Sequence, residues 1–180
     1  MSVPEISHHL WLKSVIGKDL VDGEARELFM ISRREHFVLG DKLFEEGEAP
    51  SALFLLADGA VDITKRAVTG TTVIGSLTAG SIVGEMSLLM REQRSATAVV
   101  STPTATALRV AWKDFEDLLG QNPAVAYKLM YALARVLAAR IRIINVRLAE
   151  MAERNRNHAP HEQIEEFQTF KNKLFSDWSF

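Results

Sequence analysis

The sequence has 180 residues, 47% of them hydrophobic and 24% charged, a length and composition typical of one globular domain with an appendage. Its net charge of −2 and its lack of cysteine give no support for a nucleic-acid surface and exclude disulfides, thiolate catalysis and cysteine-ligated zinc. Because it shows neither a secretory leader nor an apolar run of the ~18 residues that a membrane span needs, we expect a cytoplasmic, soluble protein.

Two short helices are predicted at the N-terminus, over residues 5–16 and 23–33. In the second of them, Leu28, Phe29 and Ser32 fall on one face at helical spacing. We therefore expect this helix to pack with that face toward a core.

From residue 36 to residue 110 the pattern changes to short strands separated by turn residues. The predicted strands are 37–39, 42–45, 53–57, 61–66, 71–77, 82–83, 97–101 and 104–110. The dipeptide Asp58-Gly59 suits a type I′ turn and predicts a hairpin between the third and fourth strands. Many short strands at this spacing indicate an antiparallel jelly-roll barrel.

The segment Gly84–Val100 interrupts the strands with features that favour an anion. Gly84 lets the backbone approach a ligand closely, and residues 85–90 predict one short helical turn, whose first N–H groups are unpaired. Arg94 adds a planar cation suited to phosphate oxygens, and Ser95 adds donors. Glu85 repels a phosphate but accepts a hydrogen bond from a hydroxyl such as a ribose 2′-OH. Together these residues indicate a nucleotide whose phosphate is folded back on its ribose.

Two helices are predicted after the last strand. Residues 112–119 form a short helix that Gly120 is expected to end in a left-handed conformation. Asn122 as cap and Pro123 at the first helical position then begin a helix that runs without a break to about residue 153.

Apolar and small residues recur along this long helix at heptad-like spacing. They are Leu129, Ala132, Val136, Ala139, Ile143 and Val146. A helix of this length exceeds what one small barrel can bury, so a second copy of the chain is the expected partner. The alternative is an amphipathic helix that lies against its own barrel.

The remaining tail, residues 155–180, predicts at most one amphipathic helix, at 162–175. One helix cannot form a helix-turn-helix, so no direct DNA binding is expected, and the polar face lacks the basic majority of a membrane-surface helix. We expect the tail to fold back onto the dimer helices, with an effector-docking helix as the alternative. Pro160 interrupts the pair His158 and His161, so no metal site is expected, and no catalytic motif indicates an enzyme.

The segments Gly84–Leu89 and Arg94–Thr97, together with 40–48 and 53–61, resemble the phosphate-binding cassette and upstream strands of the cyclic-nucleotide-binding domain family. That family includes bacterial catabolite activators and the regulatory subunits of protein kinase A. The resemblance covers roughly residues 10–148. It implies a mainly β fold with flanking helices, in which a double-stranded β-helix, or jelly-roll β-roll, precedes a long C-terminal dimerisation helix.

The resemblance also implies a ligand, cyclic AMP or cyclic GMP, and the residues that contact it. The cassette contacts are Gly84, Glu85, Met86, Ser87, Arg94, Ser95 and Ala96. Ile63, Ile74 and Leu77 would wall the purine, with plain core packing as the alternative for each, and Arg140 would cover the base. The hydroxyl of Ser95 permits a shift toward cyclic GMP.

The expected organisation is a nucleotide-binding β-roll with N-terminal helices and a short cassette helix (residues 1–120), a dimerisation helix (121–154) and an amphipathic tail (155–180). The expected function is a non-catalytic sensor that signals to an effector protein by nucleotide-dependent movement of its C-terminal helices. Two alternatives remain: a dimeric interaction module that needs no ligand, and a catabolite-activator-family transcription regulator that acts through a partner. The sequence decides neither the nucleotide nor the downstream partner.

Overall fold

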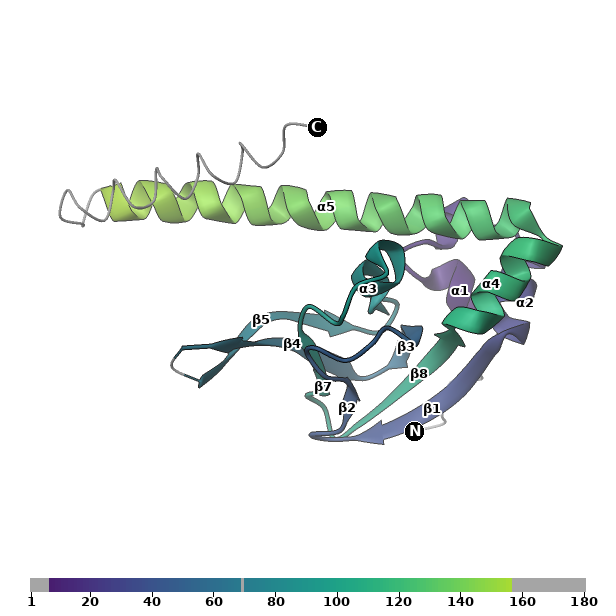
Figure 1. The fold of residues 1–180 in the computed structure, drawn as a ribbon, viewed down its shortest axis with the longest axis horizontal. Coiled ribbons are helices and arrows are strands. Elements are labelled where there is room, and N and C mark those ends of the chain that lie inside the picture. The colour runs from purple at the N-terminus through teal and green to yellow at the C-terminus, as the bar shows by residue number, and fades with distance from the viewer. Residues whose placement is uncertain (1–6, 69, 157–180) are drawn as a thin grey trace. The chain divides into compact units, whose positions relative to one another are not determined.

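The computed structural model describes residues 7–68 and 70–156. The chain divides into two compact units, Met1–Val136 and Leu137–Phe180. The helices are α1 (His9–Lys13), the 3-10 turn η1 (Gly17–Asp19), α2 (Asp22–Met30), α3 (Glu85–Met90), α4 (Trp112–Gln121) and α5 (Pro123–Arg156) (Figure 1). The strands are β1 (Ser32–Val38), β2 (Lys42–Phe44), β3 (Ala52–Asp58), β4 (Ala60–Ala67), β5 (Gly70–Thr78), β6 (Ile82–Val83), β7 (Thr97–Val100) and β8 (Thr104–Ala111).

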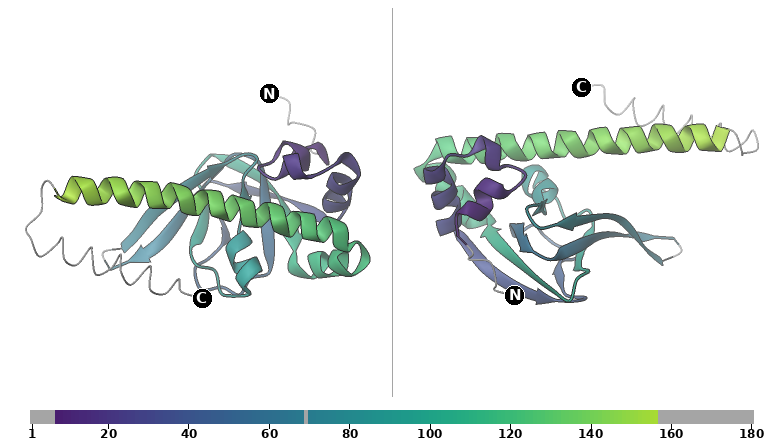
Figure 2. Two further views of the ribbon diagram at one scale, coloured as in Figure 1. Left: turned by 90° about the horizontal axis from the view of Figure 1, so that it is seen from above. Right: turned by 180° about the vertical axis from the view of Figure 1, so that it is seen from behind.

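The strands form two antiparallel sheets of four strands each, in the orders β1-β8-β3-β6 and β2-β7-β4-β5. In the views of Figures 1 and 2 the β4–β5 hairpin extends beyond the other strands. This arrangement is the predicted β-roll, and the mainly β fold class with flanking helices is confirmed.

Strand β3 is buried on both faces, which explains its unbroken apolar sequence. Leu53 and Leu55 face a core shared with the helices, whereas Phe54 and Leu56 face a second core between the two sheets. Side chains alternate along a strand, so this one strand connects the two cores of the first unit.

Helices α1, α2, α4 and the first turns of α5 supply the other side of the first core. Trp11, Leu28, Phe115 and Leu129 are each at most 1% exposed and belong to one cluster with the β3 leucines. This cluster joins the N-terminal helices to the start of the long helix.

The predicted hairpin at Asp58-Gly59 is wrong. Strands β3 and β4 belong to different sheets, so Gly59 is the point at which the chain crosses between them. Its φ of 82° lies in the left-handed region, and a Cβ there would lie 2.6 Å from the carbonyl oxygen of Thr104. Glycine is required here, but for a crossover between sheets and not for a two-residue turn.

Three predicted helix ends are also wrong. The first helix ends at Lys13 because Ser14 turns extended and its hydroxyl donates to the carbonyl of Trp11 at 2.7 Å. The second ends at Met30, and Ser32 pairs with β8 as the first residue of β1. Gly120 lies inside α4, whose C-cap is Asn122.

The long helix predicted from Pro123 is confirmed, because α5 runs unbroken from Pro123 to Arg156. Leu129 and Ala132 are buried in the core of the first unit, whereas Ile143 and Val146 are 52% and 54% exposed. The N-terminal part of the predicted seam is thus used within the chain itself. No helix among the described residues is long and apolar enough to cross a membrane.

Candidate functional site

The cassette lies between β6 and β7, where residues 85–90 form the short helix α3, as predicted. Gly84 precedes this helix with a φ of 88°, a left-handed conformation that favours glycine. A Cβ at this position would lie 2.7 Å from Nη1 of Arg94 and 3.1 Å from Cε1 of Phe44. Both the backbone angle and the neighbouring arginine therefore require glycine.

Arg94 is 3% exposed and is held by backbone carbonyls. Its Nη1 donates to the carbonyl of Gly84 at 2.9 Å, and its Nη2 donates to the carbonyl of Ala52 at 2.5 Å. The guanidinium lies over the ring of Phe44, 4.1 Å from its centroid. Its third nitrogen, Nε, is buried and has no hydrogen-bond partner among the described residues.

The charge of Arg94 is desolvated inside the protein. Burial lowers the pKa of its guanidinium, while the carboxylates of Glu48 and Glu85 act in the opposite direction. Arginine titrates so far above neutral pH that it stays charged. The unpaired Nε–H means that protein groups offset only part of the desolvation cost of this buried cation.

The structure brings Gly84, Glu85 and Arg94 together at the start of α3. Glu85 and Ser87 are 2% and 5% exposed, and Ala96 is also buried, whereas Met86 and Ser95 are exposed. Direct contact of the seven predicted cassette residues with a nucleotide stays a prediction.

The sequence prediction missed Lys65, which reaches the cassette from β4. Its Nζ donates to the carbonyl of Ser95 at 2.5 Å and pairs with Glu46 at 2.9 Å. Strand alternation places Lys65 on the same face as Ile63, two residues earlier, and this spacing is the signal that could have found it.

The three predicted purine-wall residues differ in their surroundings. Ile63 and Leu77 are half-buried and pack against the core between the sheets. The β4–β5 register shifts between Ile63 and Thr64 and leaves Ile74 as the extra residue of a β-bulge. Ile74 is 57% exposed, so plain core packing is wrong for it, while contact with a base stays a prediction.

Arg140 lies on the part of α5 that belongs to the second unit. Its role as a cover for the base stays a prediction. The pair His158 and His161 and the predicted amphipathic tail lie outside the described residues.

The C-terminal end of α3 is joined to α4. Arg91 ends α3 in the left-handed region, with a φ of 55°. Its guanidinium lies 5.5 Å from the ring centroid of Trp112 and 3.8 Å from a carboxylate oxygen of Glu116. Leu88 of α3 is buried in the same cluster as Phe115 of α4. These contacts link the cassette helix to α4.

A groove of about 540 Å³ lies over the sheet β2-β7-β4-β5 and contains none of the predicted ligand residues. It is lined by Leu39, Gly40, Lys42, Glu45, Asp62, Thr64, Arg66, Thr71, Thr97, Val99, Val100 and Ser101. On β4, Asp62 and Thr64 alternate with the inward Val61 and Ile63, so the groove is on the outer face of this sheet.

Comparison with known proteins agrees with this geometry. The family described as "Cyclic nucleotide-binding domain" matches residues 34–122. A crystal structure of a cyclic nucleotide-binding domain from Methylobacillus flagellatus superimposes with a TM-score of 0.74 at 27% sequence identity. That superposition covers 80% of this chain and 83% of the other.

Two curated relatives share about a third of their aligned residues with this chain. Glutaminase 1 of Bradyrhizobium diazoefficiens is 34% identical over 125 residues, which are 69% of this chain and 20% of that protein. The cyclic AMP receptor protein of Thermus thermophilus is 34% identical over 106 residues, which are 58% of this chain and 49% of that protein. The chain thus spans about a fifth of the first relative and about half of the second.

The sequence of residues 34–122 matches the family. The two four-stranded sheets and the cassette between β6 and β7 agree with that match. This chain belongs to the cyclic nucleotide-binding domain family, with the domain at residues 34–122 and a long helix, α5, after it.

Proposed function

We propose that this chain is a non-catalytic sensor of a cyclic nucleotide, cyclic AMP or cyclic GMP. The phosphate would lie on Arg94, Ser95 and the amides at the start of α3, including that of Ser87, and Glu85 would accept the ribose hydroxyl. One observation carries the proposal: a buried arginine with an unpaired Nε adjoins a buried glutamate and a left-handed glycine. That set supplies a cation, an acceptor and close backbone approach within one loop.

The names of relatives support a cyclic nucleotide as the ligand class. The Thermus relative is named a cyclic AMP receptor protein. Lys65, which bonds to the carbonyl of Ser95, would place a second cation near the bound phosphate.

The proposed signal passes from α3 to α4 and the first part of α5. Leu88 shares a buried cluster with Phe115 and Leu129, and Arg91 links the end of α3 to Glu116. A nucleotide would shift an existing equilibrium between two arrangements of these helices, by no more than its difference in affinity for them. A change from 1:99 to 99:1 requires about 5.5 kcal/mol of that difference.

The proposed output is a changed surface for an effector protein, presented by a homodimer. Ile143 and Val146 of α5, two members of the predicted heptad seam three residues apart, are exposed and supply a face that a second copy would cover. The proposal includes neither catalysis nor direct DNA binding.

Isothermal titration of the full chain with cyclic AMP and then cyclic GMP tests the ligand. We expect one site per chain, and affinity about 10- to 100-fold weaker in Glu85→Gln, which removes the charge of the acceptor, and in Arg94→Lys, which removes the planar two-pronged donor. Glu92→Gln, at an exposed position of the same cassette, is the matched control and should bind as the wild type does. Absence of heat with both nucleotides, from a folded protein shown to be free of nucleotide, would overturn the sensor.

A ligand-independent interaction module is the second candidate, and one observation favours it. Two guanidinium nitrogens of Arg94 are already bonded to the carbonyls of Gly84 and Ala52, so the cassette is closed by protein groups alone. This candidate predicts no heat with either nucleotide and an unchanged oligomeric state in Glu85→Gln.

A further inference from the structure

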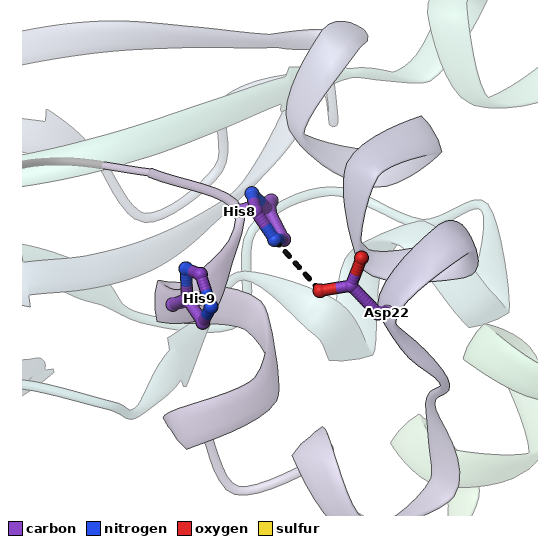
Figure 3. A group of neighbouring side chains, drawn as sticks. All are labelled: His8, His9 and Asp22. Atoms are coloured by element: carbon purple, nitrogen blue, oxygen red, sulfur yellow. Dashed lines mark hydrogen bonds and ion pairs between the residues drawn. The ribbon is translucent and has the colours of Figure 1, made fainter.

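Three side chains with metal-ligating atoms converge at the starts of α1 and α2 (Figure 3). His8, His9 and Asp22 each offer one such atom, and these atoms all lie within 4.8 Å of one another. Nε2 of His8 lies 2.8 Å from Oδ1 of Asp22, and the two imidazole centroids are 4.1 Å apart.

Neighbouring groups orient the members of this cluster. Nε of Arg26 donates to Oδ2 of Asp22 at 2.7 Å, which leaves Oδ1 directed toward His8. Oγ of Ser7 lies 3.2 Å from Nδ1 of His9. Partners of this kind, which hold the carboxylate and the ring of a ligand, are a regular feature of metal sites.

We propose that His8, His9 and Asp22 form a binding site for a divalent transition-metal ion of the Zn²⁺ class. Two imidazole nitrogens and one carboxylate oxygen suit zinc and other late first-row metals, and three protein ligands leave one position for water. Bonds of about 2.0–2.1 Å in tetrahedral geometry place ligand atoms about 3.3 Å apart. The present separations therefore need to change by at most about 1.5 Å, which side-chain rotation supplies.

A structural hydrogen bond alone accounts for less of this geometry. His8 and Asp22 form a partly exposed pair, with side chains 13% and 53% exposed, and pairs that solvent reaches contribute little to stability. That pair does not involve His9, which follows His8 in the sequence and has its ring centroid 4.1 Å from that of His8. Arg26 opposes a cation by its charge, but it is bonded to the carboxylate oxygen that the metal does not use.

Metal at this site would link the start of α1 to the start of α2. Trp11 of α1 and Leu28 of α2 are buried in the cluster that also holds Leu129 of α5. The metal would therefore stabilise the helices that support the start of the long helix, by a route independent of the nucleotide.

The test uses the full chain in a His158→Gln/His161→Gln background, because those two histidines are the competing ligands in the tail. Titration with ZnCl₂ and visible absorption of bound Co²⁺ measure binding and geometry. We expect one equivalent of metal, a tetrahedral Co²⁺ band, and affinity at least tenfold weaker in His9→Gln and in Asp22→Asn. His36→Gln, which alters a histidine bonded to Thr106 on β1, is the matched control and should bind normally.

Two outcomes would overturn the site. The first is wild-type affinity in His9→Gln, which replaces an exposed ligand. The second is loss of all Zn²⁺ binding in the His158→Gln/His161→Gln background with His8, His9 and Asp22 intact. Removal of metal by a chelator is expected to lower the unfolding temperature of the wild type and leave that of Asp22→Asn unchanged.

Discussion

Gly84 and Arg94 constrain each other at the entrance to α3. The glycine allows a φ of 88° and leaves the space that Nη1 of Arg94 fills. The arginine in turn donates to the carbonyl of Gly84 and packs on Phe44. A change at either position therefore alters the charge that would receive a phosphate.

Gly84→Ala is expected to lower the free energy of unfolding by about 1–3 kcal/mol, because a non-glycine residue is strained in the left-handed region. It should also weaken nucleotide binding, since the new Cβ displaces Arg94. Urea denaturation and titration measure the two effects.

Gly120→Ala is the matched control for this substitution. Gly120 lies inside α4, and a Cβ added there would have no atom from outside this helix within 4 Å. Alanine is therefore expected to stabilise the protein by about 0.5–1 kcal/mol. A Gly84→Ala protein as stable as the wild type would contradict the strained-glycine account. Destabilisation by Gly120→Ala would instead support the helix end that the sequence predicts there.

The side chain of Glu46 connects the loop after β2 to strand β4 of the β4–β5 hairpin. Its carboxylate accepts from the backbone N–H of Arg66 at 3.0 Å and pairs with Lys65 at 2.9 Å. These two contacts, the Arg66 N–H first, lower the pKa of Glu46 below its usual 4.5. Lys65 also bonds to the cassette, so the hairpin and cassette share this anchor.

A carboxyl group whose pKa is lower in the folded state stabilises the protein at pH above its unfolded pKa. The contribution of Glu46 is therefore expected to be constant from pH 7 to about 5, and lost as the pH falls through the lowered folded value. Unfolding temperatures of the wild type and Glu46→Gln, measured from pH 7 to pH 3, should converge at the acid end. A difference that persists at pH 3 would show that the side chain acts through its shape and not its charge. Glu92→Gln, on the exposed cassette surface, should leave the pH profile unchanged.

Helix α5 belongs to both compact units, its first turns to one and its later turns to the other. Its first turns complete the core beside α1, α2 and α4, through Leu129, Ala132 and Leu133. Its later turns carry exposed isoleucine and valine, which the proposed homodimer would bury.

Ile143→Glu is expected to raise the dissociation constant of the dimer at least tenfold, because it places a charge in the proposed apolar interface. Analytical ultracentrifugation over a range of concentrations measures this change. Tyr127→Glu, at a position 67% exposed on the first turns of α5, is the control and should leave the dimer intact. A wild-type chain that is monomeric at all concentrations would contradict the homodimer.

Local sequence patterns predicted much of the fold and the centre of the site. Residues 84–95 contain the glycine, the short helix and the arginine, so an anion-binding loop was predicted from this segment alone. Pro123 and the absence of a later helix breaker likewise predicted α5, because helix continuity depends on neighbours along the chain. The β-branched runs and turn residues predicted short antiparallel strands for the same reason.

The tertiary structure decided what depends on contacts between distant residues. Turn chemistry at Asp58-Gly59 is the same for a hairpin and for a crossover, and only the pairing of β3 with β8 separates them. The carbonyl of Ala52, the ring of Phe44 and the amine of Lys65 meet the cassette from other strands. His8 and Asp22 are joined across a turn between two helices. Sequence patterns specify the conformation of a segment, whereas its partners depend on how all the segments bury their apolar faces together.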